Sequence, residues 1–438
     1  MESLQLKLLN DRYLSIKKIG SGSYSEVWLA YDITTKSPKA LKIGITDCQD
    51  ASECELDVLK VIKSKSSFHH HLNWMDDYFS IKIDGEDTTC IVFDLMAGSV
   101  NDLLKKNFPE GMPLETVVEI IRQVAIATDA LHKIGYVHTD IKPENLLVAT
   151  SISKYSELFN ELSKLSYNKI KKVDFLRKQK WIKKWVTNDD KSSAKPESED
   201  SNSDTDTDSS EESDTTTLSR HSDESYRIYF DREMSDDTND TDESDTETFS
   251  NTVPFLSLDS EWIKKPSIRL SDFGGCVDIS KLTNRELQTK HYRAPEVIIR
   301  SPYNALIDSW SIGCLMYELL TGEVLFSPDS TGVTCDRNHL LLIQRFVCLF
   351  PLTFIKQGIR TPVFYRPDGL LRGVSSTDIK RTLQYHSINE ALVHQKEQWG
   401  TKYKMVIEVL RGLLSFENRW SISILLEHPL LKGNLGAT

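Results

Sequence analysis

The sequence predicts an α+β fold of two lobes, a small β-rich lobe with one helix and a larger, mainly α-helical lobe, with a long disordered insert. Three observations predict it. Short runs of alternating apolar and polar residues fill 13–92, helical periodicities begin near residue 101, and the composition changes abruptly at 151–265. We expect the first lobe at 11–96, the second lobe at 97–150 and 266–433, and the insert at 151–265.

The first lobe carries one predicted helix, at 51–62, where Cys54, Val58 and Ile62 share a stripe. A short connection at 94–98, which ends in a glycine, leads to longer helical patterns such as 117–132 and 307–320. A cleft between the two lobes, at this connection, is the natural place for a site.

The insert divides into two parts of opposite charge. Residues 151–185 carry ten Lys or Arg against three acids, interleaved with aromatic residues, and predict a basic amphipathic helix. Residues 189–248 hold 22 Asp or Glu against five Lys or Arg, which predicts disorder. Two interpretations stay open: a solvated spacer, or a binding element in which the basic part binds the acidic part or a partner.

Composition also indicates the cellular compartment of the protein. The acidic part of the insert has a balance of −17, so the rest of the 438-residue chain, whose total is −12, is mildly basic at +5. Seven cysteines without a C-x-x-C pair indicate reduced thiols. Without a signal peptide or an uninterrupted apolar span, we expect the protein in the cytoplasm or nucleus. We also expect a monomer that binds neither membrane nor nucleic acid.

A glycine-containing turn follows the first predicted strand. Residues 20–27 read Gly-Ser-Gly-Ser-Tyr-Ser-Glu-Val, and glycines let backbone N–H groups approach phosphate oxygens. Alone, the turn fits a plain hairpin better. Lys42, late in a following strand, and Glu55, on the nearby helix, reverse that preference because such a pair holds an ammonium against the α- and β-phosphates. The nucleotide-binding candidates here are Ile19, Gly20, Ser21, Gly22, Ser23 and Val27.

Residues 138–145, His-Thr-Asp-Ile-Lys-Pro-Glu-Asn, have the order that phosphoryl transfer requires. Asp140 would accept the proton of a substrate hydroxyl, Lys142 would lie near the γ-phosphate, and Asn145 would hold Mg²⁺. Asp140 alone could be a helix cap, but a cap does not explain the octapeptide. Asp272, in Asp-Phe-Gly at 272–274, adds a hard oxygen of the kind that Mg²⁺ prefers.

These motifs, followed by Ala-Pro-Glu at 294–296 and by Asp308 in a hydrophobic helix, resemble the eukaryotic protein kinases over 13–146 and 268–431. The resemblance implies a bilobal protein kinase fold, ATP and Mg²⁺ as cofactors, and Ser or Thr of protein substrates as acceptors. It also places nucleotide-binding residues at Ala40, Lys42, Phe93, Asp94, Met96 and Leu147.

The resemblance further implies contacts within the second lobe. Glu296 should pair with Arg419, and Asp308 should accept hydrogen bonds from backbone amides of the catalytic loop, 138–145. Thr289 should hydrogen-bond Asp140 and Lys142 and so belongs to the catalytic set.

The chain is most similar to the SR-protein kinases. Thr139 stands where most kinases have an arginine, Ser25 replaces the third loop glycine, and Arg12 and Tyr13 lead into the first strand. The hexapeptide Gln-Thr-Lys-His-Tyr-Arg at 288–293 and the charged spacer add to this similarity. Substrates rich in Arg-Ser pairs are the expectation that it implies.

Three features depart from the SR-protein kinases. Asp-Phe-Gly and Ala-Pro-Glu are the general kinase forms, where that family usually has Asp-Leu-Gly and Ser-Leu-Glu. The third is charge, because the stretch 323–373 offers four acids against six Lys or Arg. An arginine-rich ligand would find little attraction there, and Arg-Ser specificity is left open.

Because Thr139 replaces the arginine that usually grips a phosphorylated activation loop, we expect constitutive activity. The alternative is a pseudokinase scaffold that binds basic partners through the acidic insert. A complete catalytic set argues against a scaffold. Its members are Lys42, Glu55, Asp140, Lys142, Asn145 and Asp272.

Overall fold

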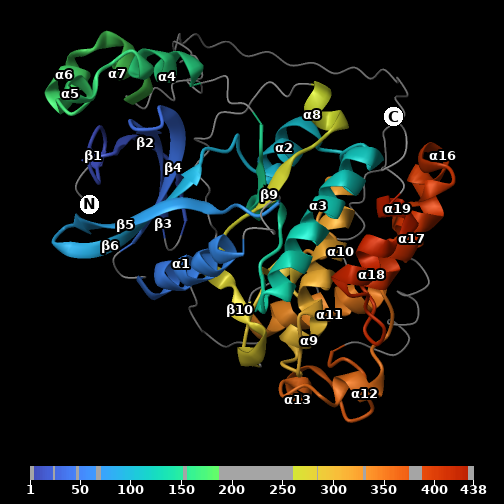
Figure 1. The fold of residues 1–438 in the computed structure, drawn as a ribbon. Helices are drawn as coiled ribbons and strands as arrows, with labels where there is room; N and C mark the ends of the chain where they lie inside the picture. Colours follow the sequence, from blue (N-terminus) through green and yellow to red (C-terminus); the bar gives the residue numbers. More distant parts are fainter. Residues whose placement is uncertain are drawn as a thin grey trace, which may run out of the picture. The chain divides into compact units, whose positions relative to one another are not determined.

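The computed structural model describes residues 4–22, 25–45, 49–65, 71–150, 155–186, 260–283, 285–328, 332–373 and 387–432. The acidic stretch 189–248 and Ser23 of the predicted glycine loop lie outside these residues. A β-sheet with one helix precedes a mainly helical region (Figure 1), which confirms the predicted α+β, bilobal fold class. No helix within the described residues combines the length and apolar character needed to cross a membrane. The exact domain boundaries stay predictions.

The first lobe is built on one antiparallel sheet of six strands in the order β1-β2-β3-β4-β6-β5 (Figure 1). The sheet starts before the predicted boundary at residue 11, because Leu8 and Leu9 pair with β2. At the β5–β6 turn, Asp84 and Gly85 have φ of 51° and 94°, which a tight Asp-Gly hairpin turn requires. The strands are β1 (Leu8–Leu9), β2 (Tyr13–Ser21), β3 (Ser25–Asp32), β4 (Ser37–Gly44), β5 (Met75–Ile83) and β6 (Glu86–Asp94).

Helix α1 (Gln49–Ser64) contains the predicted segment 51–62 and supplies Leu56, Leu59 and Ile62 to the apolar core. The connection after β6 is tied to the second lobe by two backbone hydrogen bonds. Ala97 N–H donates to Val148 O at 2.9 Å, and Val148 N–H donates to Gly98 O at 2.8 Å. This pair of hydrogen bonds fixes the connection against the strand that follows the catalytic loop.

The second lobe is organised around α3 (Leu114–Lys133) and α10 (Leu306–Thr321), which match the predicted segments 117–132 and 307–320. Gly313 lets α10 approach the end of α17, because a Cβ there would lie 2.8 Å from Leu414 Cδ2. Within the described residues, the other α-helices of this lobe are α2 (Val100–Asn107), α8 (Ser260–Lys264), α9 (Pro295–Ile298), α11 (Gly332–Phe346), α12 (Leu352–Ile355), α13 (Thr361–Phe364), α15 (Ile388–Ala391), α16 (Lys396–Trp399), α17 (Lys402–Leu413), α18 (Ile422–Glu427) and α19 (Pro429–Lys432).

Two short strand pairs position the loops between the large helices. Strand β8 (Leu146–Val148) pairs with β9 (Ile268–Leu270), and β7 (Tyr136–Val137) pairs with β10 (Val277–Asp278). The pairing of Leu146 with Leu270 places the residue before β8 and the residues after β9 at the same end of one hairpin. Residues that lie more than a hundred positions apart in the sequence are therefore neighbours in space.

The basic half of the insert differs from the single amphipathic helix predicted for it. Residues 155–186 form four short helices, α4 (Ser156–Ser163), α5 (Tyr167–Ile170), α6 (Val173–Lys178) and α7 (Lys180–Val186) (Figure 1, green). Their buried apolar residues pack on side chains of β2 and β3. The chain is thus divided into short helices that each bury one or two apolar residues.

Candidate active site

Lys42 lies on β4 between two carboxylates from different elements. Its Nζ is 2.7 Å from Oε2 of Glu55 on α1 and 2.9 Å from Oδ1 of Asp272, which follows β9. Burial alone would lower the pKa of Lys42, but the two negative charges outweigh it and raise that pKa. Lys42 therefore carries its positive charge at neutral pH.

The two carboxylates differ in what they can reach. Glu55 has a side chain only 4% exposed, and burial raises its pKa. Asp272 is 47% exposed, and the charge of Lys42 lowers its pKa. Buried Glu55 thus serves to hold Lys42 in place. Asp272 is an ionised carboxylate that a ligand can reach from solvent.

Asp140 is held by side chains from its own loop and from the activation segment, which we define as residues 272–296. Thr289 Oγ1 donates to Asp140 Oδ1 at 2.6 Å, and Asn145 Nδ2 donates to Oδ2 at 3.0 Å. Lys142 Nζ lies 3.0 Å from Oδ2 and donates to Thr289 Oγ1 at 2.9 Å. The Asp140 carboxylate is therefore fixed in orientation, as a proton acceptor for a positioned hydroxyl must be.

Asp308 at the start of α10 supports the backbone of the catalytic loop. Its fully buried carboxylate accepts the N–H groups of His138 at 2.8 Å and Thr139 at 2.9 Å. Thr139 has a φ of 68°, a left-handed conformation that persists only when the surroundings hold it. Thr139 Oγ1 also donates to Gly275 O at 2.7 Å, which ties the catalytic loop to the activation segment.

The Mg²⁺-ligand candidates come together through the β8–β9 hairpin. Asn145 precedes β8 and Asp272 follows β9, and the N–H and Oγ of Ser271 both donate to Asn145 O at 2.9 Å. Phe273 is buried and its ring meets His138 edge to face at 5.8 Å. Lys142 of the catalytic loop also acts electrostatically on the Asp272 carboxylate. Asp140, Asn145 and Asp272 thus belong to one site.

The donors at this site fit a divalent cation and a triphosphate. Asn145 commits its Nδ2 to Asp140, which leaves its amide oxygen as a metal ligand, and the Asp272 carboxylate supplies another from the facing end of the same hairpin. Oxygen donors of this hard type are what Mg²⁺ prefers. Lys42 and Lys142 supply the two positive charges that phosphate oxygens would meet.

The nucleotide-binding candidates lie along the sheet and the connection. Val27 pairs with Lys42 and Ala40 pairs with Phe93, so these side chains lie on neighbouring strands. Gly22 N–H donates to Ser25 O at 2.9 Å, which closes the glycine turn. Asp94, by contrast, points its carboxylate to Lys39 Nζ at 2.7 Å. The candidates that are partly or fully exposed are Ile19, Gly20, Ser21, Gly22, Val27, Ala40, Lys42, Asp94, Met96 and Leu147.

Gln288 is a residue whose structural role the sequence did not reveal. It is buried at a φ of 67°, and its amide nitrogen donates to Ile307 O at 2.9 Å and to Ser311 Oγ at 2.8 Å. Its amide oxygen accepts the N–H of Ala294 at 3.0 Å. Gln288 thereby fixes the backbone on either side of Thr289 to α10. Its type and its neighbours along the chain carry no sign of this conformation.

The end of the activation segment is anchored by a buried ion pair. Arg419 Nη2 donates to Glu296 Oε2 at 3.0 Å, its Nη1 pairs with Oε1, and its Nε donates to Ser415 O at 2.9 Å. This is the pair that the family resemblance implied. It connects the segment that carries Thr289 to the helices at the far end of the lobe.

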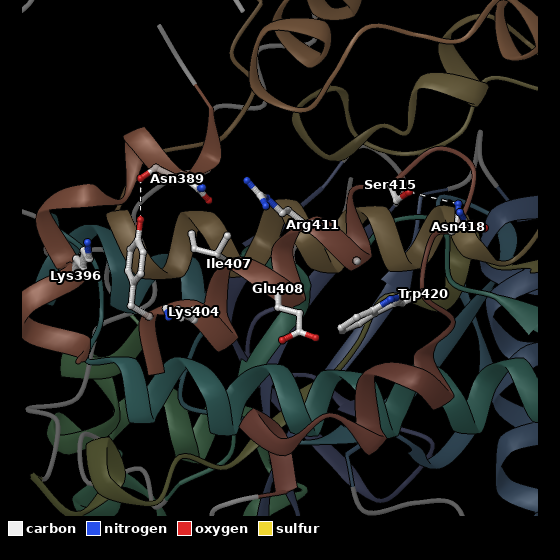
Figure 2. A pocket seen from close by; sticks show the side chains of 11 residues that line it. Asn389, Lys396, Lys404, Ile407, Glu408, Arg411, Ser415, Asn418 and Trp420 are labelled. Carbon is white, nitrogen blue, oxygen red and sulfur yellow. Dashed lines mark hydrogen bonds between the residues drawn. The ribbon is translucent and has the colours of Figure 1, made fainter. Parts of the chain in front are cut away.

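A separate concave region of about 630 Å³ lies along the outer side of α17 (Figure 2). Tyr403 donates its hydroxyl to Asn389 O at 2.9 Å at one end, and Trp420 lies at the other. Gly412 makes room for that indole, because a Cβ there would lie 2.3 Å from Trp420 Cδ2. None of the predicted catalytic or nucleotide-binding residues lines this region.

Comparisons with known proteins show what this chain is similar to. The family model described as "Protein kinase domain" matches residues 13–175 and 260–431. Protein kinase dsk1 of Schizosaccharomyces pombe is 28% identical over 395 residues, 83% of this chain and 71% of the relative. Serine/threonine-protein kinase SRPK of Physarum polycephalum is 27% identical over 84% of this chain and 74% of its own. SRSF protein kinase 3 of Mus musculus is 26% identical over 97% of this chain and 87% of its own.

Proposed function

This chain belongs to the protein kinase family, and from that premise we propose that it transfers the γ-phosphoryl group of ATP to Ser or Thr hydroxyls of proteins. The observation that carries the proposal is the clamp on Asp140. Its two carboxylate oxygens are taken by Thr289 on one side and by Asn145 and Lys142 on the other. A carboxylate held in this way keeps one orientation, as a proton acceptor for a positioned hydroxyl must.

In the proposed mechanism, Lys42 holds the α- and β-phosphates of the substrate ATP while Glu55 keeps the ammonium in place. Asn145 and Asp272 would hold Mg²⁺, which supplies charge neutralisation at the phosphates. Asp140 orients the acceptor hydroxyl and takes its proton as the oxygen bonds to the γ-phosphorus and the bond to the β-phosphate oxygen breaks. Lys142 neutralises negative charge beside Asp140, so catalysis is mainly positioning.

We also propose that the enzyme does not need activation-loop phosphorylation. The structural support is the pair of ties that hold the segment without a phosphate. Thr139 joins the catalytic loop to Gly275, and Gln288 joins the residues around Thr289 to α10.

The substrate class is a narrower proposal. The names of dsk1, SRPK and SRSF kinase 3 favour protein substrates and an SR-protein-kinase-like enzyme. Two acids of the 323–373 stretch are already paired, Asp336 with Arg360 at 2.7 Å and Asp368 with Arg366 at 3.2 Å. Asp329 lies outside the described residues. This surface offers little to a basic peptide, so we propose Ser/Thr specificity that does not depend on runs of Arg-Ser.

The enzyme is further proposed to act as a monomer in the cytoplasm or nucleus, on proteins rather than on nucleic acid or membranes. The six cysteines in the described part of the chain are all free thiols, as a reducing compartment requires. Nothing in the contacts or the comparisons favours the scaffold alternative.

An arrayed peptide library tests the function. Purified protein with MgATP should label Ser- and Thr-containing peptides, including some without arginine next to the acceptor. Absence of label above that of an Asp140→Asn variant would contradict the proposed function. Label confined to Arg-Ser peptides would contradict the narrower proposal alone.

A further inference from the structure

Helices α4–α7, here called the insert helices, form a second apolar core with the first lobe. This core is separate from the one between α1 and the helical lobe. Tyr31 of β3 stacks on Phe159 of α4 at 6.0 Å between ring centroids. The fully packed members of this core are Leu6, Leu14, Ile16, Leu29, Tyr31, Tyr155, Leu158, Leu162, Ile170, Leu176 and Ile182.

The strand register shows which face of the sheet the insert helices cover. Successive side chains of a strand point to opposite faces, and directly paired residues share a face. Val27 pairs with Lys42 and Leu29 pairs with Ala40, so Val27, Leu29 and Tyr31 lie on the face that carries Lys42. The insert helices therefore pack on the continuation of the face that carries the nucleotide-binding candidates.

Ile19, which is itself a nucleotide-binding candidate, and Leu95, which lies between two others, pack against this same core. Ile19 immediately precedes Gly20 of the glycine turn, and Leu95 lies between Asp94 and Met96 in the connection. Both side chains are partly buried against the core that the insert helices complete. The core thus touches the nucleotide site at its glycine turn and at its connection.

Polar contacts also secure the insert helices to the segment before β2. Gln5 Nε2 donates to Val186 O, the end of α7, at 2.7 Å. Lys171 Nζ lies 2.9 Å from Asp11 Oδ1, next to the start of β2. The end of α7 and the turn that follows α5 are thereby fixed to the lobe that holds the glycine turn.

We propose that the insert helices hold Ile19 and Leu95 in position at the nucleotide site. In this way they set the affinity of the protein for adenine nucleotides. This inference rests on the proposed function. A loosened core leaves β2 and the connection less often in the binding-competent arrangement, and the apparent dissociation constant rises in proportion. The residues involved are positioning residues, because none of them is assigned a contact with the reacting atoms.

The test uses Leu162→Ala in the full chain. Leu162 is fully buried in α4, and we expect the Kd for ADP, measured by calorimetry, and the KM for ATP to rise about fivefold or more as the competent fraction falls. The KM for a peptide substrate should stay unchanged. An unchanged Kd for ADP in folded protein would overturn the inference.

The matched control is Leu410→Ala, the same truncation at a fully buried position of α17 in the other core. It should leave the Kd for ADP at the wild-type value, and an equal rise there would also overturn the inference, because it would reflect general loosening. A second control, Lys172→Ala on the exposed side of the insert helices, should change nothing. If Leu162→Ala does not fold by circular dichroism, Ile182→Val is measured in its place. A raised Kd for ADP in that variant supports the inference, and an unchanged Kd overturns it.

Binding of ADP does not require phosphoryl transfer. A wild-type protein that binds ADP but transfers no phosphate would contradict the proposed function and leave the insert-helix experiment valid. A wild-type enzyme that transfers phosphate while Leu162→Ala binds ADP normally would contradict the inference alone.

Discussion

Thr289 donates a 2.6 Å hydrogen bond from its hydroxyl to Asp140 Oδ1, although 149 residues separate the two along the chain. Lys142 donates to the same hydroxyl at 2.9 Å, so Thr289 connects the side chains of Asp140 and Lys142 in the catalytic loop. The position of the activation segment is thereby coupled directly to Asp140, the residue that is proposed to take the proton.

Replacing Thr289 by Val keeps the shape of the side chain and removes the donor. We expect kcat to fall about tenfold to a hundredfold because Asp140 is no longer held in one orientation. The Kd for ADP should stay unchanged, and Thr289→Ser should restore most of the rate. A Val variant with wild-type kcat would show that this bond has no part in the reaction.

Replacing Glu55 by Gln removes the charge that holds Lys42 but keeps the volume. Lys42 would then pair with Asp272 alone, and kcat/KM for ATP should fall at least about tenfold in steady-state kinetics. Asp57→Asn is the control on the same helix, because Asp57 is exposed and pairs only with Lys60 in the described part of the chain. Equal losses in the two variants would assign the effect to α1 as a whole.

Phosphatase-treated enzyme should keep its rate to within about twofold, since Thr139 and Gln288 hold the activation segment without a phosphate. Gln288→Ala should lose most of the rate, because it removes the bonds to Ile307, Ser311 and Ala294. Rates are compared on the same peptide after removal of phosphate is confirmed by mass spectrometry. Loss of most activity on phosphatase treatment would contradict constitutive activity.

The fold class, and the set of residues that meet at the candidate site, could be predicted from the sequence because phosphoryl transfer constrains residue type and spacing together. Lys42 and Glu55 lie 13 residues apart on a strand and a helix, and the structure brings them to 2.7 Å. Asn145 and Asp272 come together because β8 pairs with β9. The entropic cost of that pairing grows only slowly with the length of chain between the two strands.

What the sequence did not predict depends on tertiary contacts. Gln288 acts through a left-handed backbone conformation and a buried amide, and neither leaves a periodic pattern. The insert helices bury Leu158, Leu162 and Ile182 at spacings that are interrupted by turns, and the sequence pattern predicts one amphipathic helix instead of four short ones. The first strand, at Leu8, is too short to show alternation.

Buried Glu318 gives a pH dependence of stability. Burial raises the pKa of Glu318 from its usual 4.5 to about 7, while Tyr292 donates its hydroxyl to Oε2 at 2.6 Å. The folded state holds the proton more tightly than the unfolded state, so this stabilisation is complete below about pH 4.5. It is lost as the pH rises through about 7, a change on the order of 3 kcal/mol.

Glu318→Gln, which mimics the neutral acid, should therefore flatten the fall in Tm between pH 5 and 8 (roughly the window of this shift). Thermal unfolding is followed by circular dichroism at a series of pH values. Glu397→Gln, at an exposed position of α16, should leave the wild-type profile intact. Parallel profiles for wild type and Glu318→Gln would refute the assignment to Glu318.

The most direct test of one shared site for Asp140 and Asp272 is single-turnover transfer of the γ-phosphoryl group, measured beside MgATP binding in two variants. Asp140→Asn should bind MgATP with wild-type affinity and transfer no measurable phosphate. Asp272→Asn should lose both transfer and the Mg²⁺-dependent part of nucleotide binding. Transfer by either variant at the wild-type rate would contradict a shared catalytic site.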